Sequence, residues 1–371
     1  MTGKIVFPEP SVDRDGPLGW AEPGVNFYLE STRPQAVAAR AWINAAYQRF
    51  PDDEKGTFAG RLRSADETQH YTAMDELFVH DQLIRVGRVV HEEDGKGPDF
   101  RIYREGTYVG AVEVCSLFEN REWFQARQRH ARIADELQKH IPLEQWYITF
   151  DLVRLHQQPS LKRIATWVKQ QMAALPSVLE DPRMTTSPVT YKTDDVELRF
   201  RFIRRVSNSA PKPTDRVVMN GQISGGMVDS YLRLRSALEK KVQKRYETRG
   251  KPLAIFVGTK DWACSLDQFE DALVGNEQIL ISSGEVGRAN NGFFGRNKER
   301  PSGKHQDISC VFAARNWLPW EPEKFTTLRF DNPFATHDFP NDLLPADHTL
   351  GLVRNEQARW LEWMPSRPTS Y

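Results

Sequence analysis

Apolar residues recur at helical spacing in two segments near the start of the chain. Residues 34–50 place an apolar side chain at every third or fourth position, and Pro34 suits the first turn of a helix. Residues 67–87 repeat the pattern with Met74, Leu77 and Phe78 on one face, and Gly87 marks the end. The two segments predict consecutive helices.

The period then changes from helical spacing to the short runs that are typical of strands. Three such runs, at 88–92, 99–103 and 108–114, are rich in β-branched and small residues. A long amphipathic helix is predicted over 120–141, and a further strand over 145–153. Residues 66–153 therefore read in the order helix, three strands, helix, strand.

Helices and strands continue to alternate in the remainder of the chain. Helical patterns and short apolar runs follow one another, with a strongly basic helix at 228–247 and a buried strand at 252–259. Such alternation predicts an α/β protein with a mixed sheet. We expect four regions: an N-terminal arm with helices (1–65), a core (66–155), an α/β extension packed on it (156–330) and a proline-rich tail that wraps the surface (331–371).

The charge balance restricts the classes of partner. Lysine plus arginine and aspartate plus glutamate both count 50, so the net charge is zero. A neutral chain argues against a protein that simply coats DNA, and any nucleic-acid surface must come from local segregation of charge.

The cysteines and the hydropathy pattern indicate the compartment. The three cysteines, Cys115, Cys264 and Cys310, form neither a zinc pattern nor a disulfide framework, which favours a reducing environment. The first residues are polar, and no run reaches the roughly 18 apolar residues of a membrane span. We expect a cytoplasmic protein without a membrane partner.

Two carboxylates stand next to the predicted strands. Asp99 follows Pro98, and Glu113 lies inside the otherwise apolar or small run 108–118. Asp99 has an ordinary alternative as a turn residue. A purely structural role is less satisfactory for Glu113, because a buried carboxylate needs a cation or another partner.

The order of elements, with "PDF" on the second strand and "VEV" on the third, resembles the PD-(D/E)xK nuclease superfamily, which has the restriction-endonuclease-like fold. The resemblance covers about 66–153. It implies that Asp99 and Glu113 bind Mg²⁺ or Mn²⁺, and that Glu76 on the preceding helix joins them. The family has a lysine two residues after the second acid, where this chain has Cys115.

The resemblance implies a metal-dependent, endonuclease-like hydrolase that acts on DNA. We expect the Val114 carbonyl as a third metal ligand and Cys115 within the catalytic group. Because a thiol lacks the charge of lysine, the alternative is a catalytically impaired module that binds nucleic acid or assembles with a partner protein. A homodimer is left open as well. An unrelated α/β enzyme is a third hypothesis, and no nucleophile elbow, dinucleotide fingerprint or histidine metal spacing favours it.

Basic and amide side chains on two predicted helices are candidates for contacts to nucleic acid. They are Gln125, Gln128 and Arg129 on the helix after the third strand, and Arg235, Lys240, Lys241 and Lys244 on the basic helix. Lys241 or Lys244 is a candidate replacement for the missing lysine. The alternative for each is a solvated polar helix face. The loop at 285–305 joins phenylalanines to basic residues, as in surfaces that stack bases.

Overall fold

A computed structural model of the chain describes residues 5–51, 55–91, 97–141, 143–157, 159–175, 186–205, 215–218, 229–261, 264–279, 286–289, 291–295, 303–315, 317–354 and 361–365. The chain divides into two compact units. Unit 1 consists of residues 1–13, 24–119 and 228–371, and unit 2 of residues 14–23 and 120–227. No helix among the described residues is long and apolar enough to cross a membrane.

Four helices begin unit 1: α1 (Asn26–Glu30), α2 (Pro34–Gln48), α3 (Lys55–Leu62) and α4 (Glu67–Leu83). The two helices predicted in this part of the chain, α2 and α4, are confirmed. The Asp66 side chain accepts hydrogen bonds from the backbone of Thr68 and Gln69, which satisfies two of the free amides at the start of α4.

An eight-stranded mixed sheet forms the centre of unit 1, in the order β1-β2-β3-β7-β10-β11-β12-β13. Its strands are β1 (Arg88–His91), β2 (Phe100–Arg104), β3 (Thr107–Leu117), β7 (Leu253–Thr259), β10 (Ile308–Arg315), β11 (Thr326–Asp331), β12 (His348–Arg354) and β13 (Leu361–Pro365). The first three strands are antiparallel, whereas β3, β7 and β10 run parallel. The predicted α/β class with a mixed sheet is confirmed.

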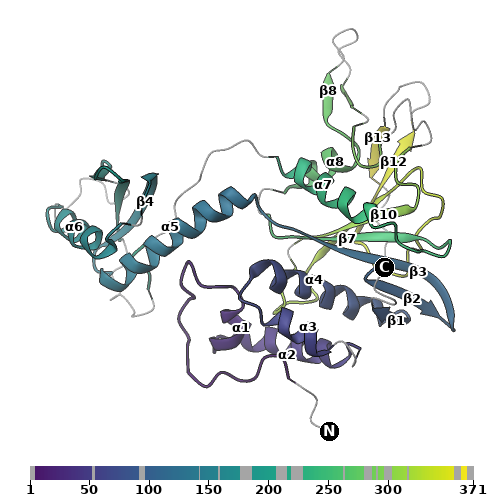
Figure 1. The fold of residues 1–371 in the computed structure, drawn as a ribbon, viewed down its shortest axis with the longest axis horizontal. Helices are drawn as coiled ribbons and strands as arrows, with labels where there is room; N and C mark the ends of the chain where they lie inside the picture. Colours follow the sequence, from purple (N-terminus) through teal and green to yellow (C-terminus); the bar gives the residue numbers. More distant parts are fainter. Residues whose placement is uncertain are drawn as a thin grey trace. The chain divides into compact units, whose positions relative to one another are not determined.

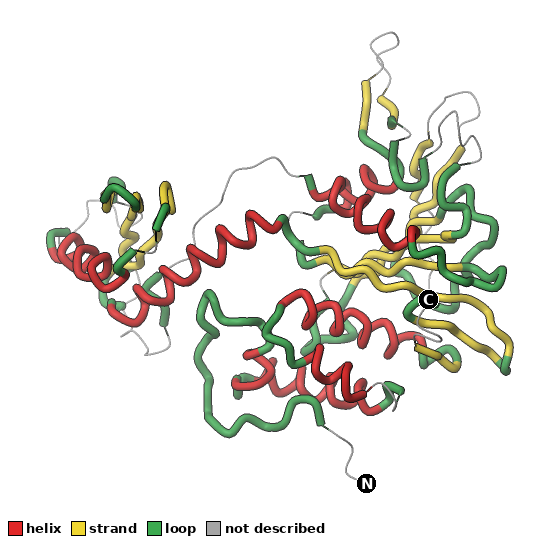
Figure 2. Tube along the Cα trace, in the orientation of Figure 1, coloured by secondary structure: helices red, strands yellow, loops and turns green. Residues whose placement is uncertain are grey.

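Helices cover both faces of this sheet (Figures 1 and 2). On one face α4 packs over Val112, Val114 and Phe256 in one hydrophobic cluster. On the other face lie α7 (Ser230–Gln243) and α8 (Leu266–Leu273). Side chains alternate along β3, so that Glu113 and Cys115 share the α7 face. A separate pair, β8 (Glu277–Ile279) and β9 (Val286–Arg288), also belongs to unit 1.

Unit 2 interrupts the connection between β3 and β7. The chain leaves β3, forms unit 2, and returns at residue 228 to make α7 and then β7, which pairs parallel to β3. Unit 1 therefore contains α4, three antiparallel strands, α7 and a parallel strand in that order, once residues 120–227 are set aside.

The predicted boundaries of the core, 66–155, are wrong for the last two elements. The helix and strand that follow β3 are α5 (Arg121–His140) and β4 (Trp146–Leu155), and both belong to unit 2. There β4 pairs with β6 (Val196–Arg204), which pairs with β5 (Val189–Lys192). The apolar face of α5 and the helix α6 (Leu161–Ala173) pack on this small sheet around Phe150 and Phe200, in a hydrophobic core of their own.

The two ends of the chain are also less peripheral than expected. Val6 and Phe7 are buried, and their backbone amides both donate to the side-chain oxygen of Asn44 in α2. The C-terminal region contributes β12 and β13 to the main sheet instead of only wrapping the surface. Residues 348–354 and 361–365 are thus part of the main sheet of unit 1.

Candidate active site

The two predicted acids meet at the start of the β2–β3 pair. The register of the strands pairs Phe100 with Val112, which places Asp99 beside Glu113. The Asp99 amide donates to Glu113 Oε2 over 3.0 Å, and the Val114 amide donates to Asp99 Oδ2 over 2.6 Å. Both residues are buried, with Glu113 entirely inaccessible. The strand pairing therefore holds two carboxylates together at a fixed separation.

A lysine from α7 completes this pair. Lys241 Nζ lies 2.6 Å from Glu113 Oε1 and 4.0 Å from Asp99 Oδ2. Lys244, three positions later on the same helix face, places its Nζ 3.5 Å from Glu113 Oε1. The position two residues after Glu113 on β3 holds Cys115 and not a lysine, but an ammonium group reaches the acids from a different element.

The start of α7 is tied to the ends of β3 and β7. Arg233 donates to the Phe118 carbonyl over 2.8 Å and to Asp261 Oδ2 over 2.7 Å. Ser230 donates to the same Asp261 oxygen over 2.6 Å. Because the Asp261 carboxylate is fully buried, these bonds fix where α7 begins and so where Lys241 arrives.

Glu76 lies close enough to affect Asp99, but its carboxylate is engaged elsewhere. Arg61 of α3 donates to both Glu76 oxygens, over 2.9 and 2.5 Å. His91 Nε2 lies 4.0 Å from Glu76 Oε2. Of the three acids expected to act together, Asp99 and Glu113 are thus linked through hydrogen bonds, whereas both carboxylate oxygens of Glu76 accept hydrogen bonds from the Arg61 guanidinium.

Burial and charge set the protonation of the site. Burial and the neighbouring Glu113 raise the pKa of Asp99 to about 8, Lys241 opposes this rise, and Glu76 adds to it. Burial lowers the pKa of Lys241, but Asp99 and Glu113 outweigh burial, so the net shift is upward. Burial and Glu113 likewise raise the pKa of Tyr246, which follows α7. Lys241 is therefore a permanent cation near neutral pH, and Asp99 is mostly protonated.

Cys115 does not join these groups. It lies in the hydrophobic cluster between the sheet and α7, and burial raises the pKa of its thiol to about 11. A protonated, soft sulfur is a poor ligand for Mg²⁺ and a poor nucleophile. The expected catalytic role for Cys115 is therefore not supported by its surroundings, which are those of a small core residue. The metal role of the Val114 carbonyl stays a prediction.

Comparison with protein-family models, with curated proteins and with solved structures gives no match to this chain. Functional assignment therefore depends on the chemistry of the site.

The donor atoms of the pair suit a hard divalent cation. Carboxylate oxygens are the ligands Mg²⁺ prefers, and Mg²⁺ commonly takes only one or two of them while keeping several waters. No cluster of three or more histidine, cysteine or acidic side chains arranged for a metal is found among the described residues. Asp99 and Glu113 therefore fit a water-rich Mg²⁺ or Mn²⁺ site and not a tightly caged one.

The other predicted contacts to nucleic acid are spread over both units. Arg235 on α7 donates to the Asn291 carbonyl over 2.7 Å, and Lys240 is exposed. Gln125 and Arg129 are exposed and Gln128 is half-buried, all on α5 of unit 2. The stacking role expected for the loop at 285–305 is wrong for Phe293 and Phe294, which are fully buried; residues 285, 290 and 296–302 lie outside the described residues.

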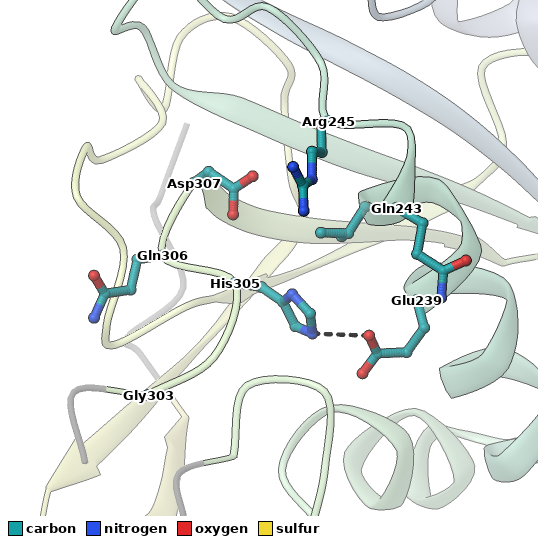
Figure 3. Close-up of a pocket in the computed structure, with 8 residues that line it drawn as sticks. Glu239, Gln243, Arg245, Gly303, His305, Gln306 and Asp307 are labelled. Carbon is teal, nitrogen blue, oxygen red and sulfur yellow. Dashed lines mark ion pairs between the residues drawn. The ribbon is translucent and has the colours of Figure 1, made fainter. Parts of the chain in front are cut away.

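A cavity of about 560 Å³ lies on a different side of α7 (Figure 3). Glu239, Gln243 and Arg245 line it from α7 and the residues after it, opposite Gly303, His305, Gln306 and Asp307. His305 Nε2 lies 3.1 Å from Glu239 Oε2 across one wall. The acid pair does not line this cavity, so α7 separates two polar regions.

Proposed function

We propose that the protein is a metal-dependent nuclease that hydrolyses phosphodiester bonds of DNA. The observation that supports this most directly is the buried Asp99–Glu113 pair with Lys241 at 2.6 Å from Glu113. Two acids can hold a hard cation, and an ammonium group beside them can stabilise the charge that develops on phosphate.

The topology of unit 1 supports the same proposal. A helix, three antiparallel strands, a crossover helix and a parallel strand form the order implied by the resemblance, with α7 and β7 in the places first given to α5 and β4. We infer a restriction-endonuclease-like core into which residues 120–227 are inserted. In this arrangement the second acid and the lysine, which the family carries two residues apart on one strand, come from two elements: the acid from β3 and the lysine from the crossover helix.

Each residue then has a defined task. A bound Mg²⁺ would supply polarisation of the phosphate and a lowered pKa for a water molecule. Asp99 and Glu113 would hold the cation, and Asp99 must release its proton to do so. The Lys241 ammonium keeps its charge and donates to phosphate oxygens, since its raised pKa excludes service as a base at neutral pH.

A nuclease-like module without turnover is the second candidate. The Arg61 fork on Glu76 favours it, because an acid held by both oxygens is not free to orient water or a metal ligand. In that case the acids and lysines would serve as a structural ion cluster, and the protein would bind nucleic acid or a partner without cutting.

Cleavage assays distinguish the two candidates. Supercoiled, linear and single-stranded DNA would be incubated with Mg²⁺ or Mn²⁺, using wild type, Glu113→Gln and, as the matched control, Glu239→Gln on the outer side of α7. We expect metal-dependent cleavage by wild type and by Glu239→Gln, and a loss of at least 100-fold, the rough size of one removed electrostatic contact, in Glu113→Gln. Absence of cleavage by wild type, or equal cleavage by Glu113→Gln, would exclude the nuclease.

A further inference from the structure

Charge is unevenly divided between the two units, although the chain as a whole is neutral. Unit 2 carries 18 lysine and arginine residues against 13 aspartate and glutamate residues, which gives a net charge of +5. The rest of the chain carries 32 basic and 37 acidic residues, or −5. A polyanion would therefore be attracted to unit 2, and unit 1 would contribute little to long-range attraction.

Within unit 2, eight of the 18 basic residues lie on the helices α5 and α6. The helices α5 and α6 pack side by side and bury their apolar faces in one core with the small sheet. From Arg129 to the end of α6, the exposed positions of the two helices are Arg129, Arg132, Lys139, Lys162, Arg163, Thr166, Lys169, Gln170 and Ala173. Six of these nine are lysine or arginine and none is acidic, whereas the acids of α5 are the exposed Glu122 in its first turn and the half-buried Asp135 and Glu136, so this stretch of the surface is predominantly positive.

Most of these cations have no carboxylate that neutralises them. Lys139 pairs with Glu136 over 3.1 Å. Lys162, Arg163 and Lys169 on α6 form no ion pair with any described residue, and the α6 sequence contains no acid. Lys162 and Lys169 lie seven positions apart, about 10 Å along the helix axis at 1.5 Å per residue. That spacing lets both contact one phosphate backbone.

We propose that the outer surface of α5 and α6 is a docking site for the phosphate backbone of double-stranded DNA. The inference builds on the proposed function, since it names the surface that recruits the substrate. Duplex is favoured over single strands because none of the nine exposed positions is aromatic, and single-strand sites stack bases on aromatic rings. Trp167 of α6 instead packs against Tyr191 and Phe200.

The test measures binding without cleavage, in the full chain and in EDTA. The Kd for a labelled 30-base-pair duplex would be measured by fluorescence anisotropy at 50, 100 and 200 mM KCl. The variant Lys162→Gln/Arg163→Gln/Lys169→Gln would be compared with a control of equal charge change and composition in unit 1, Arg88→Gln/Lys251→Gln/Lys324→Gln, whose three residues are also exposed. Circular dichroism melting confirms that both variants fold.

We expect the α6 variant to weaken duplex binding by at least about tenfold at 100 mM salt. The slope of log Kd against log salt should fall by roughly 0.9 for each phosphate that is no longer neutralised, up to about 2.7, while the control keeps the wild-type slope. Equal effects of the two variants, no duplex binding by wild type at 50 mM salt, or tighter binding of single-stranded DNA or RNA would each overturn the proposal. If the wild-type protein binds duplex DNA through α6 but cleaves no DNA, only the proposed nuclease function is refuted.

Discussion

Lys241 Nζ lies 2.6 Å from Glu113 Oε1, although the two residues are 128 positions apart in the chain. The intervening unit 2 supplies most of that separation, because α7 is the first element after it. The contact joins a strand acid to a lysine on the crossover helix that packs over the same strand. It gives the site the charge that Cys115 cannot supply.

Replacing Lys241 should abolish most of the cleavage and also lower stability, because Glu113 is buried and keeps only the more distant Lys244 as a neighbouring ammonium group. Lys241→Met keeps an unbranched aliphatic side chain but removes the ammonium group that would stabilise charge on the phosphate. We expect a single-turnover cleavage rate about 100-fold to 1,000-fold lower at saturating metal, the usual size of one electrostatic contact in a transition state.

Lys244→Met is the matched control for this change. Lys244 Nζ lies at 3.5 Å from Glu113 and its side chain is 57% exposed, so its removal should lower the rate less than tenfold. Equal losses in the two variants would assign the effect to the general charge of α7 and would contradict a specific role for Lys241.

The proton on Asp99 predicts how metal affinity depends on pH. A carboxyl whose pKa is about 8 must lose its proton before it binds a cation. Mn²⁺ affinity, measured by titration calorimetry, should therefore rise by up to about tenfold per pH unit between pH 6 and 8 and level off above. In Asp99→Asn the affinity should be weak at every pH, and an equally steep rise there would contradict the assignment.

The protonation of Asp99 in the folded state also predicts how the stability of the protein depends on pH. The pKa of Asp99 is raised in the folded protein, so between pH 4 and 8 the folded state binds more protons than the unfolded state, and stability falls as pH rises. Asp99→Asn removes this dependence. Its free energy of unfolding should exceed that of wild type at pH 8, by roughly 1–3 kcal/mol, and the gain should vanish near pH 4. Urea denaturation at the two pH values measures it.

The local parts of the site were predictable from sequence, whereas the long-range parts were not. Asp99 and Glu113 come from adjacent strands joined by the tight turn at Glu105 and Gly106, so the sequence places them near each other, but their alignment also needs the register shift between Ile102 and Tyr103, which the alternating pattern does not predict. Lys241 was a candidate only because of the basic composition of its helix. The assignment of α5 and β4 to the core failed because an inserted unit repeats the helix–strand pattern, and periodicity does not report which sheet a strand joins.

Arg61 was missed for a related reason. It lies on a short helix before α4 and has no motif around it, and only the fold places its guanidinium on Glu76. Glu76 itself could be proposed from its position before the first strand. A buried acid in the core helix was a signal that a cation must lie nearby, but sequence did not indicate which one.

Removing Arg61 should release Glu76 at the expense of stability. Arg61→Ala leaves a carboxylate that is only 6% exposed without its fork, which should lower the free energy of unfolding by about 2–4 kcal/mol. If Glu76 then turns toward the acid pair, it adds one carboxylate ligand to the site. The affinity for Mn²⁺ should therefore increase by about fivefold or more. The double variant Arg61→Ala/Glu76→Gln should lose both effects, and an unchanged affinity in Arg61→Ala would show that Glu76 takes no part in metal binding.

Moving the lysine back to β3 tests whether the two positions are equivalent. Cys115 shares the α7 face of β3 with Glu113, but it is only 4% exposed and surrounded by apolar residues. Cys115→Lys alone should therefore be destabilised by about 2–4 kcal/mol and cleave no faster than wild type, because a second ammonium group would be buried near Lys241. In Cys115→Lys/Lys241→Met the like-charge conflict is absent, and we expect at least about tenfold recovery over Lys241→Met alone. No recovery in a double variant that melts like Lys241→Met would show that the lysine acts only from α7.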